Sequence, residues 1–460
     1  MIFLADLNML KTPIETKQIG MFLSFEDQLN EHHPLYKLSH IIGWKVFEEE
    51  FKKYYSLTHG APAKPIRLMV ALLILKQLRN LSDESVVEQW AENSYYQYFS
   101  GAKHFTPHAP CSSTELVEFR KRIGVEGIEL IFKASIEANG KDADDDNLSG
   151  DTTIQEKNIT YPTDDKLHKR IISKCQSIAV EEQIQLRQSY RRTVKKLSVV
   201  QRMKRLKNGD LKARKANKKI KTIAGRLVRE LERKLTAAAL VKYGNNLQLF
   251  SRVLSQKRHD TNKIYSLHEP DVKCYSKGKE HKKFEFGSKA CLLITQRAGV
   301  IVGAMNFTES LHDTKTLEPI LEQHQRLTGK PAINVYLDRG FRGPRQINGT
   351  NLFTPKPDHN ISSSTRKRFK RRAAIEPTIS HLKFDHRMIR NFLKGTAGDA
   401  INLMLAATSF NFKRVMNKLK QKISFLLRKL ILFYNIIMGC GLYSTQKKAF
   451  LRVDYIIVIF

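Results

Sequence analysis

One stretch of the chain, residues 187–234, is constrained by its own charge more strongly than any other. It contains 19 Lys or Arg and only three acids. Apolar residues recur through it at roughly helical intervals, with a break at Asn208-Gly209, so the pattern predicts a helical hairpin or long helices. Positive charges at this density repel one another unless phosphates neutralise them. The stretch is therefore expected to contact nucleic acid, although a solvated helix face remains the alternative.

The rest of the composition points to the same partner. Lys and Arg number 79 against 45 Asp and Glu, which gives a formal net charge of +34 over 460 residues. That excess favours a polyanion, and the length suggests about three domains. A membrane surface is the weaker alternative, because the most apolar stretch, 430–443, has only 14 residues where a span needs about 20. It is expected to form a buried or interfacial helix, with no membrane contact.

The cysteines and the first residues bear on the compartment. Five cysteines are scattered along the chain with no CxxC pair and no spacing typical of zinc or haem ligands. They are Cys111, Cys175, Cys274, Cys291 and Cys440. The first residues lack a leading positive charge and a small-residue cleavage site. Unpaired structural thiols and a cytoplasmic, nucleoid-associated protein are expected.

Residues 64–99 have the pattern of two helices around a short turn. Ser82 is a good N-cap, and Asp83 and Glu84 fall in the first turn, where the helix dipole favours carboxylates. Such a pair resembles a helix-turn-helix that reads DNA. A packing or dimerisation bundle would have the same pattern, and both interpretations stay open.

Downstream, strand and helix patterns alternate. Strands are predicted at 147–154, 284–295, 300–307 and 332–337, a turn at 296–299, and helices at 314–327 and 376–394. Pro377 would be tolerated in the first turn of the last helix. This order predicts an α/β fold.

Three carboxylates stand where rigid elements can direct them toward one point. Asp151 lies within a predicted strand, Asp338 follows another, and Glu376 begins a helix. Carboxylates are suitable ligands for Mg²⁺, and two such ions assist phosphodiester chemistry by activating one oxygen and neutralising the leaving one. For any single Asp at a strand end, a turn cap is the simpler explanation. Six other acids compete for the role: Asp142, Asp144, Asp145 and Asp146, which are expected in a solvated linker, Glu285, which is expected to face solvent, and Glu309.

The spacing of Phe369, Arg372, Glu376 and Lys383 resembles the C-terminal motif of DDE transposases of bacterial insertion sequences, specifically the IS-5 family. That motif reads Tyr, two residues, Arg, three residues, Glu, six residues, Lys, so Phe369 stands in place of the Tyr. Segments 150–164 and 336–343 resemble the family's two Asp segments, and parts of 22–101 resemble its N-terminal domain. The resemblance extends from about residue 22 to about 412.

The resemblance implies an architecture. It is an RNase H-like catalytic core with a helical N-terminal DNA-binding or dimerisation domain and a basic helical insertion. The expected boundaries are a leader 1–30, the N-terminal domain 31–145, the catalytic domain 146–412 interrupted by the insertion 157–282, and a helical, apolar tail 413–460 that does not resemble the family.

The resemblance also implies an activity, which is strand cleavage and strand transfer at the inverted-repeat ends of an insertion sequence. Asp151, Asp338 and Glu376 would hold two Mg²⁺ ions, for which Mn²⁺ can substitute. The partners would be double-stranded DNA, as terminal repeats and target, and a second copy of the chain in the synaptic complex. The expected DNA-binding residues are Arg371, Arg372 and Lys383 near the transposon end and Lys212, Lys215, Lys218 and Lys219 in the basic stretch.

Two other functions remain open. A DNA-binding protein without catalysis, such as an architectural factor or an inactive transposon relic, would share the basic charge but would not need the three acids to converge. A nuclease on the same fold would need the acids but not paired DNA ends.

Overall fold

The computed structural model describes residues 24–56, 63–206, 208–257, 259–279, 282–341, 343–355 and 362–438. The chain divides into two compact units. We call Met1–Leu75, Ser82–Phe119 and Phe412–Phe460 the helical unit, and Lys76–Leu81 with Arg120–Asn411 the sheet unit. Each is described by itself.

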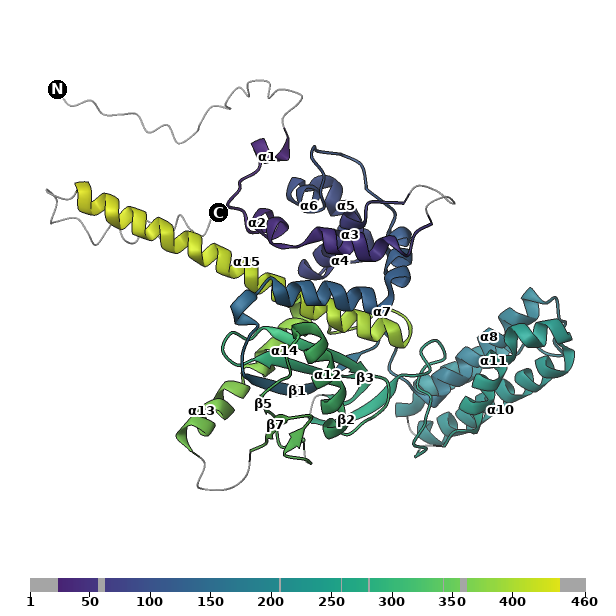
Figure 1. Ribbon diagram of the computed structural model, residues 1–460. Helices are drawn as coiled ribbons and strands as arrows, with labels where there is room; N and C mark the ends of the chain where they lie inside the picture. Colours follow the sequence, from purple (N-terminus) through teal and green to yellow (C-terminus); the bar gives the residue numbers. More distant parts are fainter. Residues whose placement is uncertain are drawn as a thin grey trace, which may run out of the picture. The chain divides into compact units, whose positions relative to one another are not determined.

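Besides the first turns of α7 (Ser113–Glu137) and the last part of α15 (Gly395–Met438), the helical unit contains short helices (Figure 1). They are α1 (Phe25–Gln28), α2 (Pro34–Ile41), α3 (Trp44–Lys52), α4 (Ile66–Leu78, whose last turn belongs to the sheet unit), α5 (Asp83–Glu92) and α6 (Ser94–Phe99). Phe47, Phe51 and Phe99 are fully buried between them. The Ser82 hydroxyl accepts a hydrogen bond from the Ser85 amide at 3.0 Å, so the predicted N-cap of α5 is confirmed.

The boundary between the units differs from the predicted end of the N-terminal domain at residue 145. Helix α7 (Ser113–Glu137) is interrupted at Gly124, whose φ of +63° breaks the helical path. The sheet unit begins at Arg120, close to this break. Residues 120–145, including the short turn η1 (Gly140–Asp142), therefore belong to the sheet unit.

The sheet unit is built on a seven-stranded mixed sheet. Its strands are β1 (Asn147–Glu156), β2 (Lys273–Lys279), β3 (Lys282–Thr295), β4 (Ile301–Phe307), β5 (Asn334–Tyr336), β6 (Gln346–Ile347) and β7 (Thr350–Phe353). The order is β2-β3-β1-β5-β7-β6, and β4 also pairs with β3. Strand β3 is antiparallel to β1, β2 and β4, whereas β5 is parallel to β1 and β7 is parallel to β5. The predicted strands 284–295 and 300–307 form the antiparallel pair β3–β4, and the mixed α/β class is confirmed.

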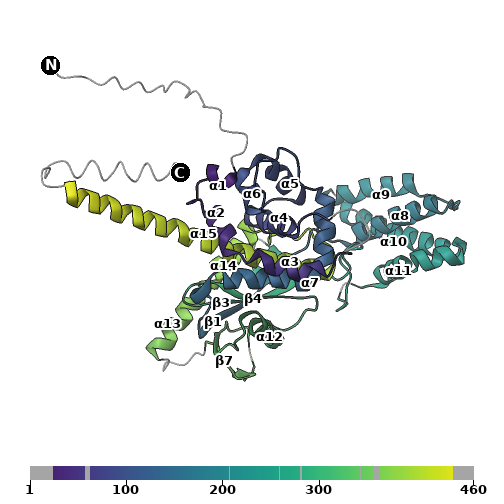
Figure 2. The same cartoon turned by 45° about the horizontal axis from the view of Figure 1, so that its top comes forward.

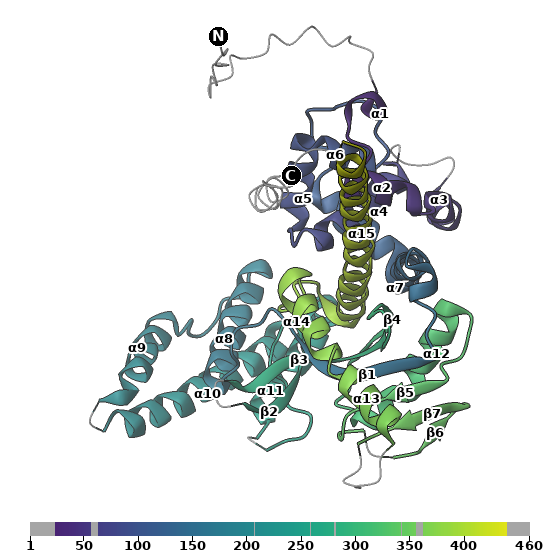
Figure 3. The same ribbon diagram turned by 90° about the vertical axis from the view of Figure 1, so that its left-hand side faces the viewer.

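Helices pack against this sheet (Figure 3). The turn η3 (Asp313–Thr316) leads into α12 (Leu317–Thr328), which packs on β3 and β4. Helix α13 (Ser363–Arg372) lies against β5, and α14 (Ile375–Asp385) lies against β1. Helix α14 ends at Asp385, so the predicted helix 376–394 is too long. The reason is Arg387, whose φ of +61° is incompatible with a helix.

The basic stretch lies in a group of helices with its own apolar core (Figure 2). They are α8 (Asp164–Glu181), α9 (Arg191–Arg202), the turn η2 (Met203–Arg205), α10 (Gly209–Lys234) and α11 (Ala237–Ser255). The predicted hairpin is confirmed, with its break at Asn208, where φ is +58°. We call α8–α11 the basic bundle. Strand β2 falls within the predicted insertion 157–282 but belongs to the sheet.

Helix α15 (Gly395–Met438) runs through the predicted start of the tail at residue 413. No helix in the described residues is both long and apolar enough to cross a membrane. Cys111, Cys175, Cys274 and Cys291 are free thiols, as predicted, and Cys440 lies outside the described residues.

Candidate active site

Asp151 and Asp338 are brought together by the parallel pairing of β1 and β5. In the register of these strands, Ser149 on β1 pairs with Tyr336 on β5. Each acid stands two residues beyond its member of this pair, and residues two apart along a strand point to the same face. The two carboxylates therefore project from neighbouring positions at the end of β5.

Glu376 joins them from α14, the helix that lies against β1. The preceding helix, α13, contacts the other strand through Phe369, whose ring meets that of Tyr336 edge-on with centroids 5.6 Å apart. The C-terminal motif is thus attached to both strands that supply an aspartate. Pro377 lies in the first turn of α14, as predicted.

The pKa of Asp151 reports on this arrangement. Burial of the carboxyl group is the main cause that raises its pKa, followed by the charge of Asp338, and Glu376 adds to the effect. The Thr152 amide, which donates to Asp151 Oδ1 at 2.7 Å, and Arg372 lower the pKa. The result is a pKa of about 6. Three acids from separate parts of the sequence therefore share one electrostatic neighbourhood.

The predicted DNA-binding residues of the motif have different surroundings. Arg372 Nη1 lies 3.9 Å from Asp151 Oδ2, and both side chains are only 17% exposed. Arg371 is exposed and donates from Nη2 to the carbonyl oxygen of Arg297 at 3.0 Å. Lys383 lies two turns from Glu376 on α14 and is partly buried. Contact of these residues with DNA stays a prediction.

A fourth acid, Asp313, was not predicted from the sequence. Its Oδ1 accepts hydrogen bonds from Thr152 Oγ1 and Lys289 Nζ, both at 2.9 Å. Gly340, which follows Asp338, is flanked by both acids, since a Cβ there would lie 3.1 Å from Asp313 Oδ2 and 3.1 Å from Asp338 Oδ1. In sequence Asp313 is merely the start of a helical turn, so only tertiary structure connects it with the site.

The chemistry of this donor set suits a hard divalent cation, because carboxylates are its preferred ligands and a second positive charge would offset the repulsion around Asp151. The spacing is looser than a compact metal site. Among the residues that the structure describes, no three His, Cys, Asp or Glu side chains are grouped closely enough to hold an ion by themselves. Mg²⁺ usually keeps several water ligands and needs few protein groups. Asp151, Asp338 and Glu376 fit an ion bound partly through water.

Two of the competing acids have structural partners. Asp145 accepts hydrogen bonds from the backbone amides of Asn147 and Arg297, and Asp144 forms an ion pair with Lys330 at 3.0 Å. Glu285 is buried rather than facing solvent as expected, because it lies on β3 between β2 and the rest of the sheet.

The basic bundle presents its lysines on one side of α10. Lys212, Lys215, Lys218 and Lys219 are exposed, whereas Ala213, Ala216 and Ile220 between them are buried. A groove of about 500 Å³ runs along α9 and α10. It is lined by Lys215, Lys218, Lys219, Arg226, Tyr190 and Thr193, among others.

Comparisons with known proteins cover part of the chain. Residues 23–122 match the family model of a transposase domain, DUF772. The chain is also 39% identical over 184 residues to the protein "ORF8 in nfe locus" of Rhizobium meliloti, which covers 38% of this chain and 88% of that relative. The chain belongs to a transposase-related family. No solved structure matches it.

In this transposase-related chain, the matched domain coincides with helices α1–α6 and the first turns of α7. It indicates a transposition-related function. The three acids and the basic bundle lie outside the matched domain, so their roles must be argued from their own chemistry.

Proposed function

We propose that the chain is a DDE transposase of the IS-5 type, which cleaves and joins DNA strands at the inverted-repeat ends of an insertion sequence. The observation that carries this proposal is the convergence on Asp151, whose pKa is raised first by burial and then by the charges of Asp338 and Glu376. A chain with formal net charge +34 has few acids to spare for one place. A stable fold alone gives no reason to gather three of them around a buried carboxyl group.

The strand order supports an RNase H-like core. Three antiparallel strands, β1, β3 and β4, are followed by β5 and β7, which run parallel to β1 on its other side. This arrangement brings the first strand and the strand after α12 side by side in the centre of the sheet. The two aspartates of the motif stand on or directly after those strands.

The roles of the residues follow from their positions. Asp151, Asp338 and Glu376 would hold two Mg²⁺ ions, and the bound ions supply activation of the attacking oxygen and neutralisation of the leaving one. Arg372 holds the Asp151 carboxylate on one side, and the Thr152 amide orients its Oδ1. Lys289 and Thr152 fix Asp313 beside the site. The substrate would be double-stranded DNA, with two copies of the chain on paired ends.

The test uses the full chain and the DNA segments that flank its gene. Asp151→Asn and Asp338→Asn are each expected to bind these segments as the wild type does and to lose Mg²⁺-dependent strand cleavage, because an amide keeps the shape but is a poor ligand for Mg²⁺. Asp385→Asn is the matched control, since Asp385 is an exposed acid at the end of α14 whose partner is His381. Undiminished cleavage by either site variant would refute the assignment.

A second function is favoured by one observation, the looser spacing of acids in the described residues. A DNA-binding relic without catalysis would bind the same segments but cleave neither strand under any divalent ion. A nuclease on the same fold would cleave single, unpaired ends as fast as paired ones. The same assay, run with one and with two DNA ends, separates all three.

A further inference from the structure

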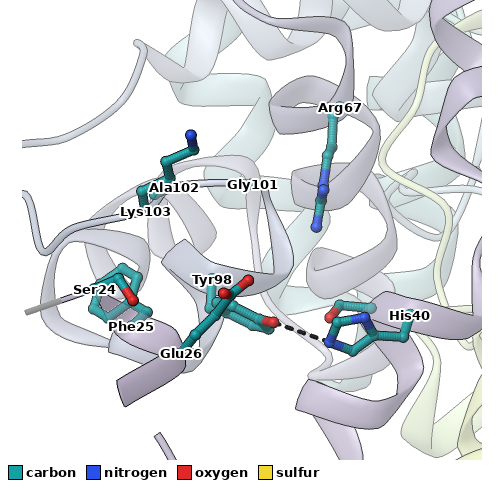
Figure 4. Close-up of a pocket in the computed structure, with 10 residues that line it drawn as sticks. Ser24, Phe25, Glu26, His40, Arg67, Tyr98, Gly101, Ala102 and Lys103 are labelled. Atoms are coloured by element: carbon teal, nitrogen blue, oxygen red, sulfur yellow. Dashed lines mark hydrogen bonds between the residues drawn. The ribbon is translucent and has the colours of Figure 1, made fainter. Parts of the chain in front are cut away.

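The helical unit contains a pocket of about 490 Å³, separate from the candidate active site. Residues of α1, α2, α4 and α6 and the loop after α6 line it (Figure 4). Its volume lies within the usual range for small-ligand sites. All of its lining residues fall within the matched transposase domain.

Arg67 on α4 is fixed at this pocket from three sides. Its guanidinium lies over the Trp44 ring, 4.9 Å from the centroid, and its Nε and Nη2 donate to the Phe99 carbonyl oxygen at 3.4 and 3.3 Å. Gly101, with φ of +94°, leaves room for the side chain, since a Cβ there would lie 2.9 Å from Arg67 Cδ. The cation is therefore held in place before any ligand arrives.

The charge of Arg67 is only partly compensated by these contacts. Its hydrogen-bond and stacking partners are a neutral carbonyl group and an aromatic ring. Burial lowers the pKa of the guanidinium more than Tyr98 and the exposed Glu48 carboxylate raise it. Desolvating a cation whose close contacts are neutral is unfavourable, and the net effect on the Arg67 pKa is a lowering, so this fixed, half-buried guanidinium beside a pocket attracts an anionic ligand.

Further hydrogen-bonding groups face the same space. The Tyr98 hydroxyl and His40 Nε2 lie 2.9 Å apart, and Figure 4 shows the Arg67 side chain directed toward this pair. Burial raises the pKa of the Tyr98 hydroxyl, which keeps it protonated and able to donate. Lys103 supplies a second cation on the rim. The rim also has one opposing charge, the Glu26 carboxylate next to Tyr98.

We propose that this pocket binds a phosphate group of a nucleic-acid strand through Arg67, Lys103 and the Tyr98–His40 pair. A guanidinium matches phosphate geometry with two parallel hydrogen bonds, and such contacts fix the register of a protein on DNA. The inference rests on the proposed function for the identity of the strand. The helical unit would then anchor a DNA phosphate, in addition to the DNA contacts proposed for the basic bundle.

A variant of Glu26 distinguishes phosphate binding in the pocket from a purely structural role of Arg67. Because its carboxylate repels phosphate, Glu26→Gln should strengthen binding by about two- to fivefold at low salt. Lys103→Gln should weaken binding by a similar factor. Both residues are exposed, so neither change threatens the fold. Arg67→Gln should weaken binding by roughly tenfold or more, as expected for a charge-assisted hydrogen bond.

The experiment measures the affinity of the full chain for a fluorescent duplex of about 20 base pairs, or about two helical turns. EDTA is present so that no cleavage occurs. Lys45→Gln, an exposed cation on α3 outside the pocket, is the matched control and should change little. If Glu26→Gln and Lys103→Gln both bind like the wild type, the pocket is not a phosphate site. If Lys45→Gln has the same effect as Lys103→Gln, only general surface charge is involved and the proposal is overturned.

Two competitors separate a DNA strand from a free ligand. Inorganic phosphate and a deoxynucleoside monophosphate should displace the duplex only weakly and less still from Arg67→Gln, because a strand adds contacts elsewhere. Tight binding of the mononucleotide alone would assign the pocket to a free nucleotide and overturn the proposal. The two proposals fail separately. Cleavage by the wild type and by Asp151→Asn tests the active site, whereas the affinities of the Glu26, Lys103 and Arg67 variants for the duplex test the pocket.

Discussion

Arg372 Nη1 lies 3.9 Å from Asp151 Oδ2, a contact that joins the helical motif to the central strand of the sheet. The guanidinium lowers the pKa of Asp151, but burial and Asp338 outweigh it. The charge of Arg372 therefore offsets only part of the unfavourable surroundings of the Asp151 carboxylate. In a protein of such high positive charge, this gathering of acids destabilises the fold and is consistent with selection for chemistry.

Removing the Asp151 charge should stabilise the protein. The difference between its pKa of about 6 and the ordinary value of 3.8 corresponds to about 3 kcal/mol. Because the folded-state pKa is raised, this destabilisation is absent below about pH 4 and complete above about pH 6. Asp151→Asn should raise the free energy of unfolding by about 1–3 kcal/mol at pH 7.5 in EDTA, measured by urea denaturation. Asp385→Asn should change it little, and a less stable Asp151→Asn would contradict the account.

Divalent cations should reverse the order of stability of the wild type and Asp151→Asn. A ligand that binds only the folded state raises its stability with concentration. Millimolar Mg²⁺ should therefore raise the melting temperature of the wild type, and it should raise that of Asp151→Asn and Asp338→Asn much less. Differential scanning fluorimetry, with Na⁺ of equal ionic strength as the control for screening, measures this. An equal shift in all three proteins would mean that the ion acts by screening.

A buried ion-pair network fixes the end of β1. Lys157 is 3% exposed, and its Nζ lies 2.6 Å from Asp399 Oδ1 and 3.5 Å from Glu269 Oε2. Lys157→Met would leave two buried carboxylates without their cation and should destabilise the protein by about 3–5 kcal/mol. Lys166→Met, at an exposed lysine of α8, is the control. Adding Asp399→Asn to Lys157→Met should restore part of the loss; no recovery would place the effect in packing rather than charge.

Two glycines should respond in opposite directions to the same change. A Cβ at Gly287 on β3 would lie 1.9 Å from the Gln155 carbonyl oxygen on β1, so Gly287→Ala requires two central strands to separate. We expect it to destabilise the protein by at least about 3 kcal/mol. Gly244 on α11 has open space around it, and Gly244→Ala should stabilise its helix by about 0.5–1 kcal/mol. Urea unfolding of both variants tests the pairing of β1 with β3.

The sequence predicted the parts that depend on local pattern. The apolar run before Thr295 and the Ser82 cap indicate their elements without help from the rest of the chain. The position of Asp151 within a strand and of Asp338 after one follow from the same patterns. Asp313 was missed because its relation to the site depends on Thr152 and Lys289, which are distant in sequence.

The errors have similar causes. The end of α14 depends on the backbone conformation of Arg387, which the helical pattern of the sequence does not reveal. Glu285 is buried because of strand β2, which lies in a segment predicted to be part of the helical insertion. In each case, tertiary pairing decided what local propensity left open.

The basic bundle should contribute mostly sequence-independent affinity for DNA. Lys212, Lys215, Lys218 and Lys219 are exposed along α10, where alanine also favours the helix, so replacing all four by Ala should not unfold it. If each lysine contacts one phosphate, the dependence of log K on log salt should flatten by about 3 to 4. Binding to transposon-end and scrambled duplexes should weaken alike.

The matched control for this variant removes cations that already have partners. Arg214 lies 2.7 Å from Asp210, and Lys234 lies 2.8 Å from Glu230. Replacing Arg214 and Lys234 by Ala should change the salt dependence by less than one per residue, because a paired cation contributes less to phosphate neutralisation. An unchanged slope in the four-lysine variant would make α10 a solvated face. A loss confined to the transposon end would instead mean that this helix reads bases, and the phosphate anchor around Arg67 would then be the better candidate for sequence-independent binding.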